Sequence, residues 1–328
     1  MDLELSDEQR WLTESVETLL AREAGPELWD RLVEFGALTV GGEDGLGPVE
    51  LCLIARALAA HLASVPYVAG AAVRFAADAD LGGDAVALAL LEPGASWDAA
   101  PSTSVDGDLV TGRKVAVEHA ATAERLAVVA AGRVVGLVDA GAPGVALAAQ
   151  PALDPTAPMY AVELVDAPMV ALGASALRRM TTIGTLLAAA EAVGAAGRML
   201  EDACAYAAER RQFGRTIASF QALRHLLADM YVRQASAWSS VLYAAAALDE
   251  DADEAARAVS VAKAYVSRAT REVAHGAIQV FGGIAVTAEH PAHRFLRRII
   301  VRERQFGDAA HHERALGRAL AVVPQTVP

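Results

Sequence analysis

The chain has 328 residues, with 28 lysines and arginines against 41 aspartates and glutamates and a net charge of −13. This acidic balance argues against a nucleic-acid-binding protein, because contacts with phosphates need a basic surface. The hydrophobic fraction of 54% excludes a disordered chain, since disorder goes with low hydrophobicity. The length suggests about two domains with a sizeable core.

The apolar stretches are all too short or too interrupted for a membrane span, which needs ~20 apolar residues. Glu191 and Arg198 interrupt the run at 183–200, and Arg133 interrupts a second run. The N-terminus lacks the basic segment of a signal peptide. The two cysteines have no metal-binding or redox spacing. We therefore expect a cytoplasmic protein with no membrane partner.

Helical periodicity covers residues 1–83, which we predict to form an N-terminal helical domain starting at Ser6-Asp7-Glu8-Gln9. From residue 84 short runs of Val, Leu and Ala alternate with Gly, Pro, Asp and Thr clusters. This pattern predicts a middle antiparallel β-domain over 84–173, with a hairpin at Val105-Asp106-Gly107-Asp108-Leu109. The strands are expected at 85–91, 126–130, 134–138, 145–148 and 160–165.

The helical period returns near residue 175 and predicts a C-terminal four-helix bundle over 174–328. The expected helices are 175–211, a second with Leu223 to Leu248 on its apolar face, 253–281, and 290–322 with a break near Gly307. The predicted fold class is therefore α+β and mainly α, in the order helices, β-domain and bundle.

The densest chemical pattern lies where the first bundle helix ends. It reads Arg210-Arg211-Gln212-Phe213-Gly214-Arg215, turns at Gly214, and leads through Ser219, a predicted N-cap, to Gln221. Guanidinium groups and amide donors at such a corner can hold a pyrophosphate. The alternative is a helix C-terminus whose arginines complement the helix dipole. Spacing alone leaves both interpretations open.

A second pattern, Gln279 with Gly282 and Gly283, closes the third bundle helix. Paired glycines allow close approach of a ligand, and a helix C-cap explains them equally well. The histidines lack the spacing of zinc motifs, so we expect no metal. An arginine run on the fourth helix predicts a solvated face, with a CoA-phosphate or partner contact as the alternative; its members are Arg294, Arg297, Arg298, Arg302 and Arg304.

Together these motifs resemble the acyl-CoA dehydrogenase family over nearly the whole chain. The resemblance begins at Leu5-Ser6-Asp7-Glu8-Gln9-Arg10 and includes Gly45-Leu46-Gly47-Pro48, Glu92-Pro93 and Gly112-Arg113-Lys114. It is most specific at Arg210-x-Gln212-Phe213-Gly214-x-x-Ile217-x-x-Phe220-Gln221, followed by Gln279-x-x-Gly282-Gly283. It implies the three domains predicted above and an FAD that lies across a dimer interface.

The resemblance also implies roles for single residues. Six residues would contact the ADP portion of a flavin held mainly by the partner subunit: Arg210, Phe213, Gln221, Gln279, Gly282 and Gly283. In this family a glutamate takes the α-proton of the acyl thioester while the flavin takes the β-hydride. Counted along this chain, its two known positions fall on Phe306 and Gly184, and neither residue can accept a proton.

The segment that covers the flavin ring in the family is altered as well, since Ala116-Val117-Glu118 stands where the family has Trp-Ile-Thr. Loss of the base and of the ring contact together resembles the short, base-lacking subunits of heteromeric acyl-CoA dehydrogenases in actinobacterial sterol side-chain breakdown. We predict such a non-catalytic subunit, which completes the FAD site of a homologous catalytic partner in an α2β2 tetramer acting on an acyl-CoA.

Two alternatives remain at this point. The first is a self-sufficient flavoenzyme with a relocated base, for which Asp308 and Glu303 are the candidates. Asp308 also fits an ordinary turn or N-cap residue, because it follows Gly307 before a new helical run. The second is a non-enzymatic scaffold or carrier-binding protein that keeps only the bundle.

Overall fold

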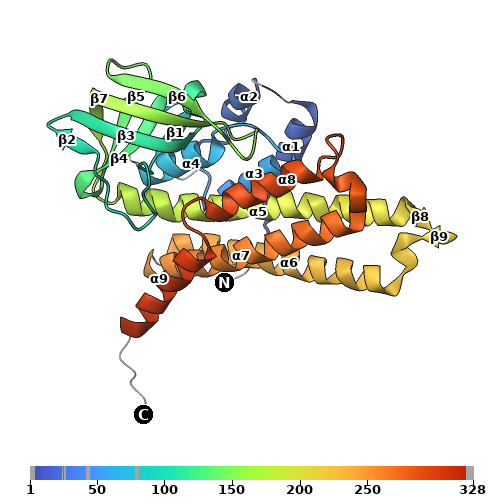
Figure 1. Ribbon diagram of the computed structural model, residues 1–328. Helices are drawn as coiled ribbons and strands as arrows, with labels where there is room; N and C mark the ends of the chain where they lie inside the picture. The colour runs from blue at the N-terminus through green and yellow to red at the C-terminus, as the bar shows by residue number, and fades with distance from the viewer. Residues whose placement is uncertain are drawn as a thin grey trace, which may run out of the picture. The chain divides into compact units, whose positions relative to one another are not determined.

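The computed structural model describes residues 4–23, 25, 27–41, 45–77, 81–250 and 252–322 (Figure 1). Contacts divide the chain into two compact units. The first comprises Met1–Ala21, Pro48–Leu62 and Thr185–Pro328, and the second comprises Arg22–Gly47 and Ala63–Gly184. The division into 1–83, 84–173 and 174–328 stays a prediction, and by contacts the early helices are shared between the two units.

The first unit is a helical bundle. Its helices are α1 (Asp7–Arg22), α3 (Pro48–Ala60), most of α5 (Ala176–Glu209), α6 (Gln221–Glu250), α7 (Ala252–Phe281), α8 (Ala292–Arg304) and α9 (Ala309–Val322). The long helices α6 and α7 lie side by side, and α7 also packs against α8 and α9 (Figure 1). The predicted break near Gly307 is confirmed, because the chain leaves the helical conformation between α8 and α9.

Helix α5 is the core of the bundle. Among the described helices of at least 18 residues, α5 is the one that is apolar enough to cross a membrane, and 89% of its apolar window is buried within the protein. Its small residues let neighbours approach closely: a Cβ on Gly194 would lie 2.0 Å from the backbone oxygen of Arg56 in α3. The apolar character of α5 therefore serves packing inside the bundle.

The start of α1 shows how local sequence sets an element boundary. The backbone N–H of Gln9 donates to Ser6 Oγ at 3.2 Å, and the N–H of Ser6 donates to Gln9 Oε1 at 3.0 Å. This reciprocal pair is a capping box, which satisfies two N–H groups that a helix start leaves without partners. The helix start predicted from these residues is confirmed.

The second unit is built on a seven-stranded sheet with α2 (Leu28–Glu34) and α4 (Tyr67–Ala76). The strand order is β1-β4-β5-β7-β3-β2, with β6 paired to β7. The strands are β1 (Val86–Ala89), β2 (Ser104–Asp106), β3 (Leu109–Glu118), β4 (Arg125–Ala130), β5 (Val134–Asp139), β6 (Val145–Gln150) and β7 (Met159–Ala171).

The sheet confirms the predicted short strands and the β2–β3 hairpin, whose turn has Gly107 at φ 60°. It differs from a purely antiparallel sheet at one pair, because β1 and β4 run parallel. Parallel neighbours need a long crossover connection, and here β2 and β3 lie within it. Run length and composition do not show which strands pair, so this mixed topology could not be predicted from them.

Candidate functional site

A small hairpin stands at the end of α5. Its strands are β8 (Arg211–Gln212) and β9 (Arg215–Thr216), joined by a turn with Phe213 at φ 52° and Gly214 at φ 77°. Figure 1 shows this hairpin beyond the ends of α5 and α6. We call residues 210–216 the tip. The tip is the part of the bundle unit that carries the densest predicted motif.

Phe213 is held in an unusual way. Its side chain is 91% exposed, and a positive φ is rare for a bulky residue and costs on the order of 1–3 kcal/mol. Its ring meets Phe220 edge-on, with 6.1 Å between centroids, and the guanidinium of Arg215 lies 4.0 Å above the Phe220 ring. Phe213 thus combines an exposed apolar ring with a strained backbone, and strained residues cluster at functional sites.

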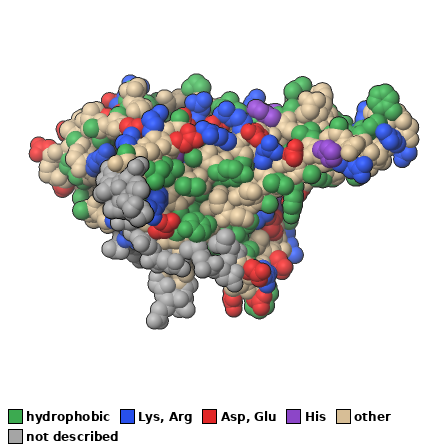
Figure 2. Space-filling model, turned by 90° about the horizontal axis from the view of Figure 1, so that it is seen from below, with side chains coloured by type: hydrophobic (Ala, Val, Ile, Leu, Met, Phe, Trp, Pro, Cys, Tyr) green, Lys and Arg blue, Asp and Glu red, His purple; other side chains and the backbone are tan. Residues whose placement is uncertain are grey.

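Arg210 is anchored by its backbone while its side chain is free. Its N–H donates to Tyr206 O and its carbonyl accepts from Ile217 N–H, both at 2.8 Å. Its guanidinium makes no hydrogen bond or ion pair with any residue that the structure describes, whereas Arg211 donates to Gly214 O at 3.4 Å. Figure 2 shows hydrophobic and basic side chains together at this end of the molecule. The tip therefore carries both a guanidinium without a partner among the described residues and an exposed aromatic ring.

Gln221 is exposed at the first position of α6. The prediction that Ser219 caps this helix is wrong. Ser219 belongs to a short 3-10 helix, η3 (Ile217–Ser219), and its hydroxyl donates to Thr216 O at 2.6 Å. The residue directly before α6 is Phe220, whose carbonyl accepts from the N–H groups of Leu223 and Arg224, both at 3.1 Å, so the N-cap position falls on Phe220.

The Gln-Gly-Gly motif lies at the same end of the bundle. Gln279 is exposed in the last turn of α7, and Gly282, at φ 67°, opens the 3-10 helix η4 (Gly282–Val286). Tyr206, one turn before Arg210, stacks edge-on against Phe281, which directly precedes Gly282, at 5.6 Å between ring centroids. The end of α5 and the end of α7 therefore meet.

Open space surrounds the two glycines. A Cβ on Gly282 or Gly283 would have no heavy atom within 4 Å beyond its chain neighbours. Free guanidinium groups and accessible peptide N–H groups can bind phosphate oxygens. The structure therefore brings all six predicted cofactor residues to one end of the bundle, in a setting suited to a phosphate-bearing ligand.

The two family base positions hold no proton acceptor. Phe306 is 4% exposed with φ 59°, and Gly184 is buried within α5. The relocated candidates are both engaged: Glu303 forms an ion pair with Arg271, and Asp308 Oδ1 accepts from His311 N–H at 2.9 Å. That hydrogen bond lowers the pKa of Asp308, which makes it a weaker base.

Buried groups fix the corner between α8 and α9. The ammonium of Lys263 donates to the carbonyl of Arg302, and His312 Nε2 lies 3.1 Å from the carbonyl of Phe306. His312 Nδ1 faces Ser260 Oγ at 3.3 Å, which fits a neutral ring that donates through Nε2. Burial, with a smaller effect from the charge of Arg302, lowers the pKa of Lys263 to about 7. The corner at the family base position is therefore held by buried hydrogen bonds between α7, α8 and α9. We call this set of contacts the joint.

The joint predicts acid sensitivity. Burial, followed by the charges of Lys263 and His311, lowers the pKa of His312 from 6.5 to about 4, although Phe306 O and Asp308 act in the opposite direction. Because the folded state disfavours protonation, stability from this group is complete above pH 6.5 and is lost as the pH falls toward 4. The loss should amount to about 3 kcal/mol at most, measured by urea unfolding across this range.

His312→Gln should flatten that acid limb, because it removes the titrating ring from the joint. His225→Gln, on the exposed face of α6, is the matched control for loss of an imidazole and should leave the limb in place. A His312→Gln protein with the same slope between pH 6.5 and 4 would contradict the assignment.

The sequence interpretation missed a buried charge cluster. Arg298 and Arg302 point into the bundle, where both pair with Glu191 of α5; all three are at most 2% exposed. The prediction of one solvated arginine face is therefore wrong for these two, while Arg294 and Arg297 are exposed. The available signal was Glu191 itself, an acidic residue inside an apolar run that requires a buried cationic partner.

Segment 116–118 stands where the family has its ring-covering residues. Val117 is fully buried, and Ala116, at φ 53°, donates from its N–H to Gln150 Oε1 at 2.8 Å. The pairing of β3 with β7 shifts register between Lys114 and Val117. Residues 116–118 therefore form an irregular strand segment with neither an aromatic ring nor a hydroxyl to offer a flavin.

Glu92 of the Glu92-Pro93 motif has a structural task. It accepts hydrogen bonds from Lys114 Nζ at 2.8 Å, from Thr103 Oγ1 at 2.7 Å and from Ser102 N–H at 2.8 Å. Burial alone would raise its pKa, but these hydrogen bonds outweigh burial and lower the pKa. The carboxylate thus ties the loop before β2 to β3.

The chain is similar to known proteins in both sequence and fold. Residues 171–321 match the family described as Acyl-CoA dehydrogenase, C-terminal domain. The acyl-CoA dehydrogenase FadE27 of Mycobacterium tuberculosis is 30% identical over 332 residues, which cover 91% of this chain and 89% of that protein.

Solved structures match this chain over almost its whole length. The ChsE4-ChsE5 complex from Mycobacterium tuberculosis matches with a TM-score of 0.86 and 28% identity, over 99% of this chain and 100% of that chain. The Tcur3481-Tcur3483 steroid ACAD G363A variant matches with a TM-score of 0.88 and 26% identity, over 96% and 98% of the two chains. The predicted mainly helical fold with a β-domain and C-terminal helices is confirmed.

Proposed function

Because this chain belongs to the acyl-CoA dehydrogenase family, we propose that it is the non-catalytic subunit of a heteromeric, FAD-dependent acyl-CoA dehydrogenase. The observation that carries the proposal is a contrast between two parts of this chain, the family base positions and the tip. Phe306 and Gly184 stand at the two family base positions, while Arg210 and Phe213 have exposed side chains at the tip. A chain that keeps exposed cofactor-contacting residues but lacks the catalytic base is suited to complete the cofactor site of a partner subunit.

The residues present fit one end of FAD and not the other. The tip and the glycine corner would hold the ADP portion of a flavin bound mainly by the partner, through Arg210, Phe213, Gln221, Gln279, Gly282 and Gly283. Segment 116–118 offers no contact suited to the flavin ring. When bound, FAD supplies the acceptor for the β-hydride of the acyl thioester. This chain would bind and orient the ADP portion of FAD, and its family base positions provide no group that takes the α-proton.

The expected partner is a homologous catalytic subunit that retains the glutamate, in an α2β2 assembly in the cytoplasm. Support comes from the neighbours in known structures, which include the ChsE4-ChsE5 complex and a Tcur3481-Tcur3483 steroid ACAD. The same neighbours favour a CoA thioester of a steroid side chain as the substrate class.

The alternative of a self-sufficient enzyme with a relocated base has little support. Glu303 is held in an ion pair with Arg271, and Asp308 caps α9 with a lowered pKa. A general base works best when its pKa lies near the operating pH. A scaffold role accounts for the fold but gives no reason for an exposed Phe213 at a strained φ.

The test compares the chain alone with the chain copurified beside its catalytic partner. We expect the lone chain to carry little flavin and to show no dehydrogenation of acyl-CoA substrates, because it lacks both the base and the ring contacts. The complex should hold one FAD per heterodimer and turn over. Flavin-to-protein ratio by absorbance and substrate-dependent reduction of an artificial electron acceptor are the measurements. Stoichiometric flavin and turnover in the lone chain would falsify the proposal.

A further inference from the structure

Three aromatic rings connect the helix ends around the glycine corner, residues 279–283. The ring of Tyr206, near the end of α5, meets the ring of Phe281, the last residue of α7, edge-on at 5.6 Å between centroids. Phe281 also contacts the ring of His290, with 4.4 Å between centroids and 54° between the ring planes. His290 lies two residues before the start of α8. The rings therefore link the ends of α5 and α7 to the start of α8.

The contact between Phe281 and His290 closes a loop. These two residues directly flank residues 282–289, which contain both glycines and the short helix η4. Burial does little to hold this loop, because Ala285 is its one buried residue within η4 and Val286 is 78% exposed. Phe281, by contrast, is 5% exposed and belongs to the core of the bundle. His290 therefore attaches the second end of the loop to a ring that is fixed in the core.

His290 also binds the start of α8. Its Nδ1 accepts a hydrogen bond from the N–H of Ala292, the first residue of that helix, at 3.2 Å. The first N–H groups of a helix have no partner within the helix, so an acceptor at this place stabilises the helix start. The side chain of His290 is thus held at two points. One contact needs an acceptor atom and the other needs a ring, so substitutions can separate them.

We propose that His290 is a positioning residue for the cofactor, an inference that rests on the flavin contact proposed above. By stacking on Phe281, it holds Gly282 and Gly283 in the conformation that binds the ADP portion of FAD. Gly282 needs this support, because its φ of 67° is one of many conformations open to a glycine. A loop that is already ordered binds more tightly, since less conformational entropy is lost on binding. His290 acts through Phe281 and does not itself contact FAD.

Two substitutions test this role. His290→Asn keeps an acceptor for the N–H of Ala292 and removes the ring. It should lower the FAD affinity of the complex with the catalytic partner by about three- to tenfold, the size expected for one aromatic contact, and leave the melting temperature of the lone chain near the native value. His290→Phe keeps a ring against Phe281 and removes the acceptor, so it should retain the FAD affinity and lower the melting temperature. Equilibrium dialysis and thermal unfolding are the measurements.

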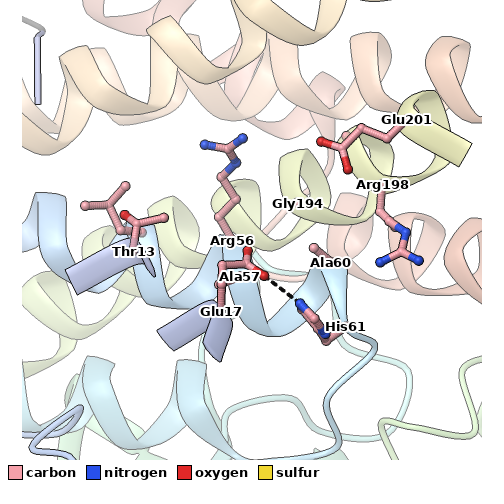
Figure 3. Close-up of a pocket in the computed structure, with 11 residues that line it drawn as sticks. Thr13, Glu17, Arg56, Ala57, Ala60, His61, Gly194, Arg198 and Glu201 are labelled. Carbon is pink, nitrogen blue, oxygen red and sulfur yellow. Dashed lines mark hydrogen bonds and ion pairs between the residues drawn. The ribbon is translucent and has the colours of Figure 1, made fainter. Parts of the chain in front are cut away.

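His61→Asn is the matched control for loss of a half-buried imidazole from the same unit. Figure 3 shows His61 beside a cavity lined by α1, α3 and α5, where its Nε2 lies 2.6 Å from Glu17 Oε2. Its side chain takes no part in the ring contacts, so the FAD affinity should not change.

Hydrogen–deuterium exchange of the lone chain adds a measurement that does not involve FAD. Exchange of the amides in residues 282–289 should be faster in His290→Asn than in the native protein, because the loop loses its attachment to Phe281. His290→Phe should exchange as the native protein does. Native-like exchange in His290→Asn would contradict the proposed positioning.

Arg210→Ala, measured in the same way, separates failure of this inference from failure of the proposed function. Reduced FAD affinity in Arg210→Ala but not in His290→Asn would overturn the role of His290 and leave the proposed flavin contact in place. Unchanged affinity in both variants would overturn both proposals. A loss of FAD affinity together with melting temperature in His290→Asn and in His290→Phe would show that His290 only stabilises α8, which also overturns its role toward the cofactor.

Discussion

Replacing Glu191 with glutamine is expected to lower the free energy of unfolding by about 3–5 kcal/mol, because it leaves two buried guanidinium groups without their counter-charge. Arg302 contacts the Glu191 carboxylate directly, and Arg298 Nη1 lies 3.8 Å from Glu191 Oε2. All three side chains are removed from water. Such a pair adds little over an apolar core when intact, but breaking it exposes the full desolvation cost of the remaining charges.

The measurement is urea unfolding of the native protein and the variant at one pH and salt concentration. Glu272→Gln is the matched control, since it removes a glutamate from an exposed ion pair with Arg233 and should cost less than about 1 kcal/mol. Adding Arg302→Gln to Glu191→Gln should cost less than the sum of the single changes, because the two residues share one contact. Strictly additive effects would show that the cluster does not act as a unit.

Local signals in the sequence were enough to predict most elements of the fold. The Ser6 and Gln9 pair sets the start of α1 through its own hydrogen bonds, and Gly107 permits the turn between β2 and β3. The break at Gly307 follows from its φ of 99°. In each case the element boundary or turn depends on residues only a few positions apart, so the local sequence is enough to predict it.

Features that depend on distant contacts could not be predicted in this way. Nothing near Arg298 or Arg302 distinguishes them from Arg294 and Arg297, and only Glu191, more than a hundred positions earlier in the chain, explains why they point inward. The parallel β1–β4 pair likewise depends on which strands meet across the sheet.

The tip lies between these two cases, because its residues could be predicted from the sequence but their meeting with the glycine corner could not. The motif predicted that Arg210 and Gly282 serve one ligand, but their shared location follows from the contact of Tyr206 with Phe281, which joins helix ends some 75 residues apart. A pattern of residues thus indicated the chemistry, and tertiary packing brought its parts to one place. The role of these residues toward FAD stays a prediction.

Arg210→Ala is expected to reduce the FAD affinity of the complex by about 10–100-fold, because a hydrogen bond between charged groups contributes about 1.5–3 kcal/mol and each 1.4 kcal/mol is a factor of ten. The side chain is exposed and makes no ion pair among the described residues, so its loss should leave the folded chain and its assembly with the partner intact. Equilibrium dialysis of FAD against the purified complex gives the affinity.

Arg211→Ala is the control that separates a specific contact from a general field effect. Both substitutions remove one positive charge from the same hairpin, but Arg211 is turned toward its own backbone, where it donates to Gly214 O at 3.4 Å. If the positive charge of the tip alone attracted the cofactor, both variants would lose affinity equally, and more so at low salt. A loss confined to Arg210→Ala, and retained at high salt, is the result that requires a guanidinium held at a defined place against the flavin of another subunit.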